Sequence, residues 1–199
     1  VRQGINFKLK IGESSIEQRV TLNHKTRTLE FKTTVDWNEC HKMLRTAFPV
    51  NMRCDSATFG IQYGYVKRPT HRNTSWDVAR FEVPAQKYVD LSDNNRGVAI
   101  LNDSKYGHKI HENIMDLNLL RSPTYPDADA DLGIHEFCYC FMPHKKDFIH
   151  SEVIQSALEF NQPPMIFVGK SAKGINPPLR VKDSSIGLEV VKRAEKEKC

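Results

Sequence analysis

The sequence predicts an all-β protein, a large antiparallel β-sandwich with one short helix near its C-terminal end. Three observations lead to this prediction. Apolar and polar residues alternate with period two along most of the chain, turn-forming residues separate the alternating runs, and a helical period occurs convincingly only once. With 199 residues, of which 39% are hydrophobic and 27% charged, the chain has the composition of an ordinary globular protein.

The strands are predicted from the alternation. In residues 28–37, TLEFKTTVDW, the odd positions from Leu29 to Trp37 share one face and carry most of the apolar side chains. Residues 57–66, ATFGIQYGYV, are expected to form one continuous strand, because apolar side chains recur at every second position as far as Tyr65. Further strands are expected at residues 14–22, 42–50, 79–83, 87–91, 97–101, 113–120 and 135–143.

The last third of the chain is expected to differ. Residues 147–161, DFIHSEVIQSALEFN, carry a partial apolar stripe at helical spacing and predict the one short helix. An extended run at 161–167, a Gly/Pro/Ser loop at 171–185 and a last strand within 185–199 should follow. Because neither an internal repeat nor a clean boundary is evident, we expect a single domain over residues 1–199.

The acidic stretch PDADADLG places Asp127, Asp129 and Asp131 at alternating positions. An EF-hand starting at Asp127 would need glycine at its sixth position and glutamate at its twelfth, and the chain has Leu132 and Cys138 there. The flanking prolines oppose continued strand pairing. The stretch is therefore predicted to be a solvated, metal-free connection between two strands, with carboxyl groups of ordinary pKa.

Five cysteines without regular spacing predict free thiols in a reducing compartment, and hence a cytoplasmic protein. Cys138 and Cys140 should share one face of a central strand. A zinc site at this strand is disfavoured, because His135 would lie on the opposite face. His108 and His111 are interpreted as surface or loop histidines.

Several functional classes are disfavoured by the sequence. The net charge of +5 is spread over short mixed clusters, not over a basic stripe, so no nucleic-acid partner is expected. Apolar runs are too short to cross a membrane, and residues 1–12 do not resemble a signal peptide. The serine-hydrolase pattern G-x-S-x-G does not occur, and the GKS at residues 169–171 has no upstream glycine at P-loop spacing.

Two polar turn regions, RPTHRNTSWD at residues 68–77 and LNDSKYGHKIHEN at residues 101–113, combine planar polar groups with aromatic rings. Such groups suit sugar hydroxyls and the faces of pyranose rings. Ordinary polar loops have the same composition. The residues alone leave both interpretations open.

A family resemblance runs through these same regions. Residues 31–51, 57–83, 87–110 and 126–144 resemble, in order, successive motifs of the α-mannosidases of glycoside hydrolase family 38. The resemblance extends over residues 29–150 and is closest to the cytosolic and vacuolar branch. It implies the C-terminal β-sandwich region only, a galactose-mutarotase-like supersandwich, in a chain truncated at both ends.

The same resemblance implies what the full-length enzyme does. It would hydrolyse terminal α-mannose residues of oligosaccharides with retention of configuration, using an aspartate nucleophile and a zinc (or cobalt) ion in an N-terminal catalytic domain. The family's zinc ligands include a His-x-Asp motif, and this sequence contains none. No catalytic residue and no metal ligand is therefore expected in this chain, and the chain alone is expected to be inactive.

The implied role of this chain is to support the catalytic domain and to border its active site. Substrate contacts are expected at the turn formed by Asn102, Asp103, Ser104, Lys105 and Tyr106. Residues 68–72, RPTHR, are the weaker candidate. The implied partners are the protein's own N-terminal catalytic domain and a mannose-containing oligosaccharide, with a homo-oligomer left open. The alternative is a carbohydrate-binding or purely structural β-sandwich module without a catalytic role.

Overall fold

The structure is a computed structural model that describes residues 2–23, 25–163, 168–169, 179–183, 186, 188 and 190–192. The chain divides into two compact units, residues 1–164 and residues 165–199. All strands and helices named below belong to the first unit. The predicted single domain over residues 1–199 stays a prediction, and the expected strand within 185–199 falls largely outside the described residues.

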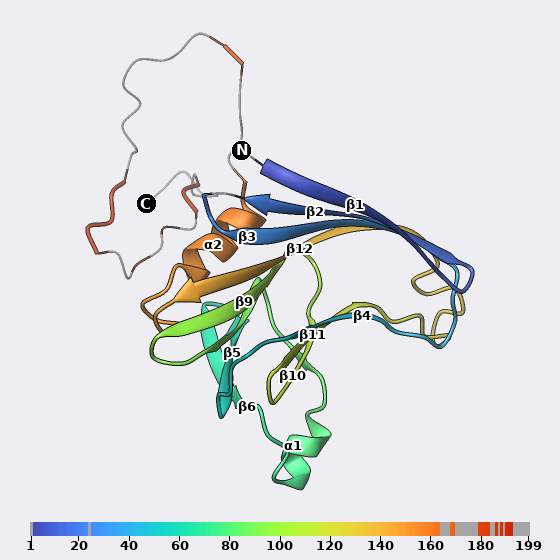
Figure 1. Ribbon diagram of the computed structural model, residues 1–199, viewed down its shortest axis with the longest axis horizontal. Helices are drawn as coiled ribbons and strands as arrows, with labels where there is room; N and C mark the ends of the chain where they lie inside the picture. The colour runs from blue at the N-terminus through green and yellow to red at the C-terminus, as the bar shows by residue number, and fades with distance from the viewer. Residues whose placement is uncertain are drawn as a thin grey trace, which may run out of the picture. The chain divides into compact units, whose positions relative to one another are not determined.

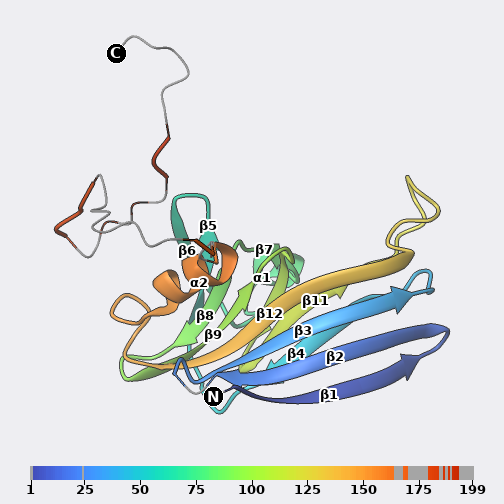
Figure 2. The same cartoon turned by 90° about the horizontal axis from the view of Figure 1, so that it is seen from above.

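The first unit is a sandwich of two antiparallel sheets (Figures 1 and 2). The larger sheet has the order β1 (Arg2–Ile11), β2 (Ser14–Asn23), β3 (Thr28–Trp37), β12 (Gly133–Lys145), β9 (Arg96–Asn102), β8 (Tyr88–Ser92), β5 (Ser56–Ile61), β6 (Gly64–Pro69). The smaller sheet has the order β4 (Leu44–Pro49), β11 (Ile114–Leu120), β10 (Gly107–His111), β7 (Val83–Pro84). The predicted all-β antiparallel sandwich is confirmed.

Two helices accompany the sheets in the described residues. Helix α2 (Val153–Asn161) packs on β8 and β9, on the side of the large sheet opposite the small sheet (Figure 1). This is the predicted C-terminal helix. Helix α1 (Ser75–Ala79) is a single short turn near the small sheet, and it was not predicted.

The core has two clusters because the central strands are buried on both faces. Along β9, Val98 and Ile100 pack in the cluster between the sheets, whereas Ala99 and Leu101 pack in the cluster beneath α2. The period of two sends alternate side chains to opposite sides. Both kinds of position are apolar here, which explains the continuous apolar run in this strand.

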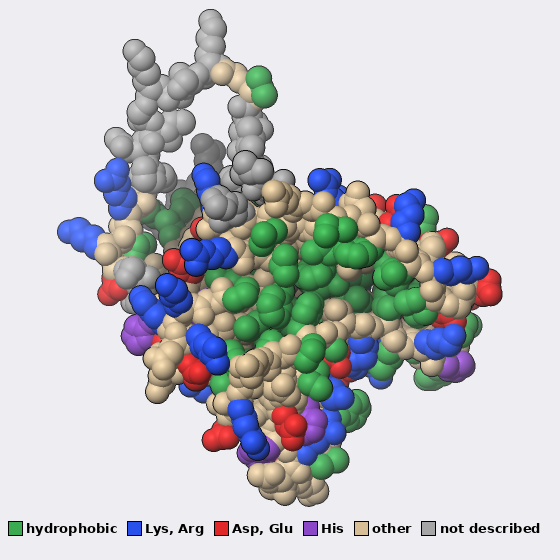
Figure 3. All heavy atoms as spheres, viewed as in Figure 1, with side chains coloured by type: hydrophobic (Ala, Val, Ile, Leu, Met, Phe, Trp, Pro, Cys, Tyr) green, Lys and Arg blue, Asp and Glu red, His purple; other side chains and the backbone are tan. Residues whose placement is uncertain are grey.

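At the β1 end of the large sheet, the inner face is not covered by any described residue. Ile5, Val20, Phe31 and Tyr139 stand in register across β1, β2, β3 and β12. Tyr139 is 2% exposed, whereas Ile5 is 64% exposed. The apolar row thus continues from the core into solvent. Figure 3 shows hydrophobic side chains gathered over the middle of the face seen there.

The bare apolar side chains continue along the edge strand β1. Phe7, Leu9 and Ile11 are also exposed, at 42%, 51% and 40%. Strand β1 was not predicted, although its apolar residues alternate from Ile5 to Ile11.

Two strand predictions are wrong. Residues 57–66 do not form one strand but a hairpin, in which β5 and β6 pair with Ile61 opposite Gly64. The turn was hidden in the sequence because Tyr63, at φ 59°, occupies a left-handed position that glycine or asparagine usually takes. With an aromatic residue at that position, the apolar alternation runs through the turn without a break. Residues 79–83 are mostly not a strand. The preceding segment forms α1, and only Val83 belongs to a strand, the short β7.

The stretch PDADADLG connects β11 to β12, as predicted. Its acids are not all solvated, however, and this part of the prediction is wrong. Asp131 adopts φ 62°, and its carboxylate accepts hydrogen bonds from the backbone N–H groups of Arg121, at 2.9 Å, and Ser122, at 3.1 Å. These bonds, the Arg121 one first, lower the pKa of Asp131.

In the described part of the chain, no helix combines the length and the apolar character that crossing a membrane requires.

Candidate functional site

The predicted substrate turn, Asn102 to Tyr106, joins β9 to β10, and its first residue has a structural role. Asn102 is 1% exposed. Its side-chain Oδ1 accepts a hydrogen bond from Lys105 N at 3.2 Å, and its carbonyl accepts one from Asn161 Nδ2 of α2 at 3.0 Å. The Asn102 side-chain amide therefore holds the turn, and its backbone carbonyl ties the turn to α2, so the buried amide is not free to contact a sugar.

Asp103 and Ser104 anchor the same turn to β12. The Asp103 carboxylate accepts a hydrogen bond from Cys138 N at 3.0 Å through Oδ2. Its Oδ1 accepts one from Ser104 Oγ at 2.9 Å. Both side chains are on the surface, yet their polar atoms already have partners.

The last two residues of the turn differ in how far they reach into solvent. Lys105 is half-buried, with its ammonium group 4.6 Å from the centre of the Phe137 ring. Burial lowers the pKa of Lys105, against the opposing charges of Asp131 and Asp103. Tyr106 is 54% exposed, and its carbonyl accepts a hydrogen bond from Ala85 N at 2.9 Å. Tyr106 is thus the large side chain that this turn presents to solvent.

His108 is not a surface histidine, and that interpretation is wrong. It lies on β10 opposite Leu117 and is fully buried. Burial, and secondarily the charge of Arg45, lower the pKa of His108 to about 3 against a smaller opposing effect of the Lys105 carbonyl. The ring is therefore neutral near pH 7, and it lies 3.3 Å from Asn102 Nδ2 through its Nε2 atom.

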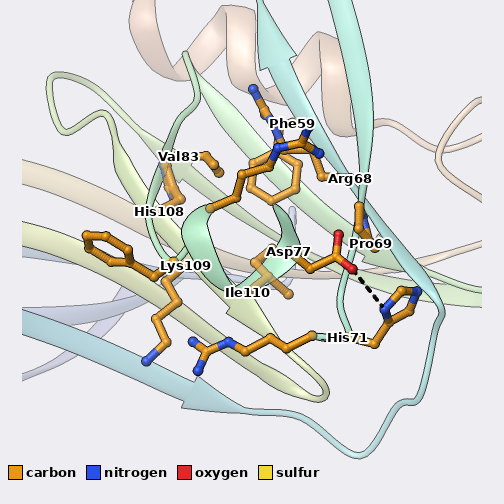
Figure 4. A pocket seen from close by; sticks show the side chains of 12 residues that line it. Phe59, Arg68, Pro69, His71, Asp77, Val83, His108, Lys109 and Ile110 are labelled. Carbon is orange, nitrogen blue, oxygen red and sulfur yellow. Dashed lines mark ion pairs between the residues drawn. The ribbon is translucent and has the colours of Figure 1, made fainter. Parts of the chain in front are cut away.

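The second predicted region, residues 68–72, lines a pocket together with β10 (Figure 4). Arg68, His71 and Arg72 contribute from the first segment and His108 from the second, whereas none of the residues from Asn102 to Tyr106 is among those that line it. The pocket is small, with a cavity volume of about 30 Å³. The structure therefore brings residues 68–72 together with β10, the strand that follows the predicted turn, although the sequence did not place them side by side.

Helix α1 contributes Asp77 to this pocket. Thr74 and Asp77 form a capping box, in which Asp77 N donates to Thr74 Oγ1 at 3.2 Å and the Asp77 carboxylate accepts from Thr74 N at 3.1 Å. His71 Nδ1 faces the same carboxylate at 3.7 Å. The signature T-x-x-D at residues 74–77 could have revealed this helix start from sequence.

Two further polar clusters were missed by the sequence analysis. Arg45 donates to Asp116 at 2.8 Å and to Glu82 at 2.7 Å, bridging β4, β11 and the segment before β7. Beneath α2, His144 Nε2 and Asp90 Oδ2 are 2.6 Å apart and nearly fully buried. Charged residues on predicted core strands, such as the aspartate in KYVDL, were the available signal.

The buried pair shifts the pKa of its histidine. Burial disfavours the charged ring of His144, but the hydrogen bond and the charge of Asp90 outweigh it, with smaller help from the Lys145 carbonyl and Asp147. The pKa of His144 is therefore raised. Ser92 Oγ donates to the other carboxylate oxygen of Asp90 at 2.5 Å, so both oxygens of Asp90 have partners.

The described cysteines, Cys40, Cys54, Cys138 and Cys140, are free thiols. Cys138 and Cys140 lie two residues apart on β12, the fourth strand of the eight-stranded sheet, as predicted. Burial raises the pKa of Cys140 to about 12, and it also raises that of Cys138. Within the described residues, no group of three or more His, Cys, Asp or Glu gathers as a metal site.

Comparisons with known proteins agree on one family. The model of the "Glycosyl hydrolases family 38 C-terminal domain" matches residues 1–129. The chain is 44% identical to human "Alpha-mannosidase 2C1" over 95% of its own length and 18% of that protein. It is 47% identical to "Alpha-mannosidase" of Saccharomyces cerevisiae over 74% of its length and 14% of that protein.

A solved structure shows the same fold. The α-mannosidase from Enterococcus faecalis V583 superposes with a TM-score of 0.68 at 23% identity, over 75% of this chain and 18% of that one. The chain thus spans less than a fifth of the length of these relatives.

Proposed function

Because this chain belongs to glycosyl hydrolase family 38, within its C-terminal domain, we propose that it is part of an α-mannosidase that hydrolyses terminal α-mannose residues of oligosaccharides. The observation that carries the proposal is the 44% identity to human "Alpha-mannosidase 2C1" across 95% of the chain. The free thiols support a cytoplasmic location. The chemistry belongs to the rest of the polypeptide.

Reaction steps are not assigned to residues of this chain. A retaining glycosidase needs two carboxyl groups about 5 Å apart across the scissile bond. The described carboxylates with resolved partners, such as Asp90, Asp103 and Asp131, are engaged in holding strands and turns. The zinc or cobalt ion stays an expectation for the catalytic domain, where it would bind sugar hydroxyls.

The proposed role of this chain is to pack against that catalytic domain. The bare apolar face of β1 and β2 supports this role, because contiguous exposed apolar patches usually mark an interaction surface. Its occupant would be the catalytic domain of the same polypeptide. In a homo-oligomer the same face would instead pack against a second copy of the protein. The charge substitutions on β1 described below distinguish these two occupants.

Activity tests the first part of the proposal. The natural polypeptide that contains these residues should hydrolyse a nitrophenyl α-mannoside, and the 199-residue chain alone should not. Absence of α-mannosidase activity in the natural polypeptide, with another glycoside turned over, would refute the assignment. If the isolated chain hydrolyses the substrate, and this activity co-elutes with the chain from a sizing column, the proposal that the catalytic residues lie elsewhere in the polypeptide is refuted.

Packing of the bare face is tested by a matched pair of charge substitutions on β1. Phe7→Glu places a carboxylate on the apolar face, and Lys10→Glu places one on the opposite face. In the natural polypeptide, Phe7→Glu should lower the yield of folded, active enzyme strongly, while Lys10→Glu should not. If Phe7→Glu leaves activity unchanged but halves the mass in solution, the face joins two copies.

Contact with substrate is tested at Tyr106, the outward side chain of the predicted turn. Tyr106→Ala should raise KM roughly threefold to tenfold with little change in kcat, because an aromatic face that binds sugar contributes to both ground and transition states. Tyr125→Ala is the control, since Tyr125 is 87% exposed in the β11–β12 connection. Equal kinetics of the two variants would remove Tyr106 from the substrate site.

A further inference from the structure

The pocket between β6, α1 and β10 has an excess of positive charge (Figure 4). Four cationic side chains and one carboxylate line it: Arg68, Arg72, Arg80, Lys109 and Asp77. In Figure 4 the Asp77 carboxylate points to His71, with which it forms the marked ion pair. Thr74 N–H and the Thr74 hydroxyl also donate to that carboxylate, at 3.1 and 2.8 Å. Asp77 is thus committed to the helix cap.

The Arg68 guanidinium is fixed in place without an anionic partner. It lies over the Phe59 ring, with its central carbon 4.9 Å from the ring centre. Its Nη1 atom is buried and has no hydrogen-bond acceptor among the described residues. Burial first, and the charge of Arg80 second, lower the pKa of Arg68. An anion between the two arginines would relieve both effects.

His108 is a second buried polar side chain that lines the same pocket. Its Nδ1 atom has no partner at full hydrogen-bond geometry among the described residues, and the nearby Lys105 carbonyl, which acts against the fall of the His108 pKa, does not reach that geometry. Asn102 Oδ1 accepts from Lys105 N, which turns the amide Nδ2 of Asn102 toward His108. Since Nδ2 can only donate, Nε2 of His108 is the acceptor, and the proton of the neutral ring is on Nδ1. Nδ1 is therefore a donor.

We propose that this pocket binds a small oxyanion, a phosphate or carboxylate group, through Arg68, Arg80 and His108. Buried donors without acceptors are rare in folded proteins and mark positions that a ligand or ordered water completes. The planar guanidinium of Arg68 offers two parallel N–H groups, which match the two oxygens of either anion. The cavity volume of about 30 Å³ admits only one or two water-sized groups, so the bound group is small.

The experiment is an anion titration on the natural polypeptide, followed by thermal unfolding. Phosphate, acetate and chloride are compared at equal ionic strength. Phosphate or acetate at about ten times its dissociation constant should raise Tm by roughly 3 °C over chloride, because a ligand of the native state stabilises it. A shift with phosphate alone assigns the phosphate class, and a shift with acetate alone assigns the carboxylate class.

Arg68→Gln should weaken the anion effect at least tenfold, since it removes the fixed fork. Arg19→Gln, an exposed arginine on β2 away from the pocket, should leave it unchanged. Line broadening of the ³¹P resonance by wild type but not by Arg68→Gln gives a readout that does not depend on stability. Equal Tm values in all three salts up to about 20 mM, or equal shifts in wild type and Arg68→Gln, would overturn the proposal.

Discussion

The centre and the β1 end of the large sheet are built from the same kind of strand but end in opposite environments. At the centre, β8, β9 and β12 bury side chains on both faces, against the small sheet on one side and α2 on the other. At the β1 end, the inner side chains continue the same row into solvent. Strand formation is thus local, whereas burial depends on what covers the sheet.

The largest expected effect lies at the doubly covered centre. Leu91, on β8, is fully buried in the cluster between the sheets. Leu91→Ala should lower the free energy of unfolding by about 3–5 kcal/mol, because a rigid core cannot close over the cavity. Urea unfolding monitored by circular dichroism measures it. A loss below about 1 kcal/mol would show that this centre is loosely packed.

The buried pair beneath α2 should give the next largest effect. Asp90→Asn should cost about 2–3 kcal/mol, because it removes the charged partner of His144. The pair is also a source of pH dependence. The raised pKa of His144 means that its contribution is complete below about pH 6.5 and is lost as pH rises through the folded pKa.

The pH effect is measured as the difference in unfolding free energy between wild type and His144→Gln. The measurement runs from about pH 6 to about pH 9, the range in which a histidine with a raised pKa titrates. The difference should shrink as pH rises. A difference that grows with pH would mean that His144 is neutral in the folded protein.

A smaller effect on the free energy of unfolding is expected at Asp131, whose side chain is held by hydrogen bonds and not by apolar packing. Asp131→Asn should cost about 1 kcal/mol, because the amide accepts the Arg121 and Ser122 N–H groups less strongly than the carboxylate does. The lowered pKa makes this contribution complete above about pH 3.9 and lost as pH falls through the folded pKa. Thermal unfolding measures it.

Asp129→Asn is the matched control for Asp131→Asn, two residues earlier in the same connection. Its side chain is exposed, and a change within about 0.5 kcal/mol is expected. Equal losses for both variants would restore the view that this connection is uniformly solvated.

The smallest effect is expected on the bare face, and it sharpens the contrast with Leu91. Leu9→Ala in the isolated chain should change the unfolding free energy by no more than about 0.5 kcal/mol, since Leu9 is 51% exposed. In the natural polypeptide the cost should rise if the face is covered. The same small value in both proteins would separate β1 from the proposed interface.

Much of the fold followed from period two, because a half-buried strand shows its inner face as alternation. The prediction failed at Tyr63, where the apolar alternation continues through a turn. It also failed at α1, because the capping spacing of Thr74 and Asp77 was not recognised. Residues of β1 carried the signal without being recognised.

The turn that carries the predicted substrate residues could be placed from the sequence, but the contacts of its side chains could not. The turn at Asn102 was found from its residue types, yet these same types are used to close the turn. His108 could not be assigned from sequence, because a strand of five residues does not reveal which face the small sheet buries. The pocket depends on contacts between β6 and β10, and strand periodicity does not report which strands lie together.

The two thiols of β12 can serve as labelling probes for the opening of the neighbouring helix α2. Cys140 is sealed in the cluster that α2 covers, whereas Cys138, two residues before it on the same strand, is partly open to solvent. A thiol reagent reaches Cys140 only after the cover has lifted, and Cys138 reports the reagent's own rate under identical conditions. The ratio of the two labelling rates therefore measures the fraction of time in which α2 is detached from the sheet while β12 stays paired.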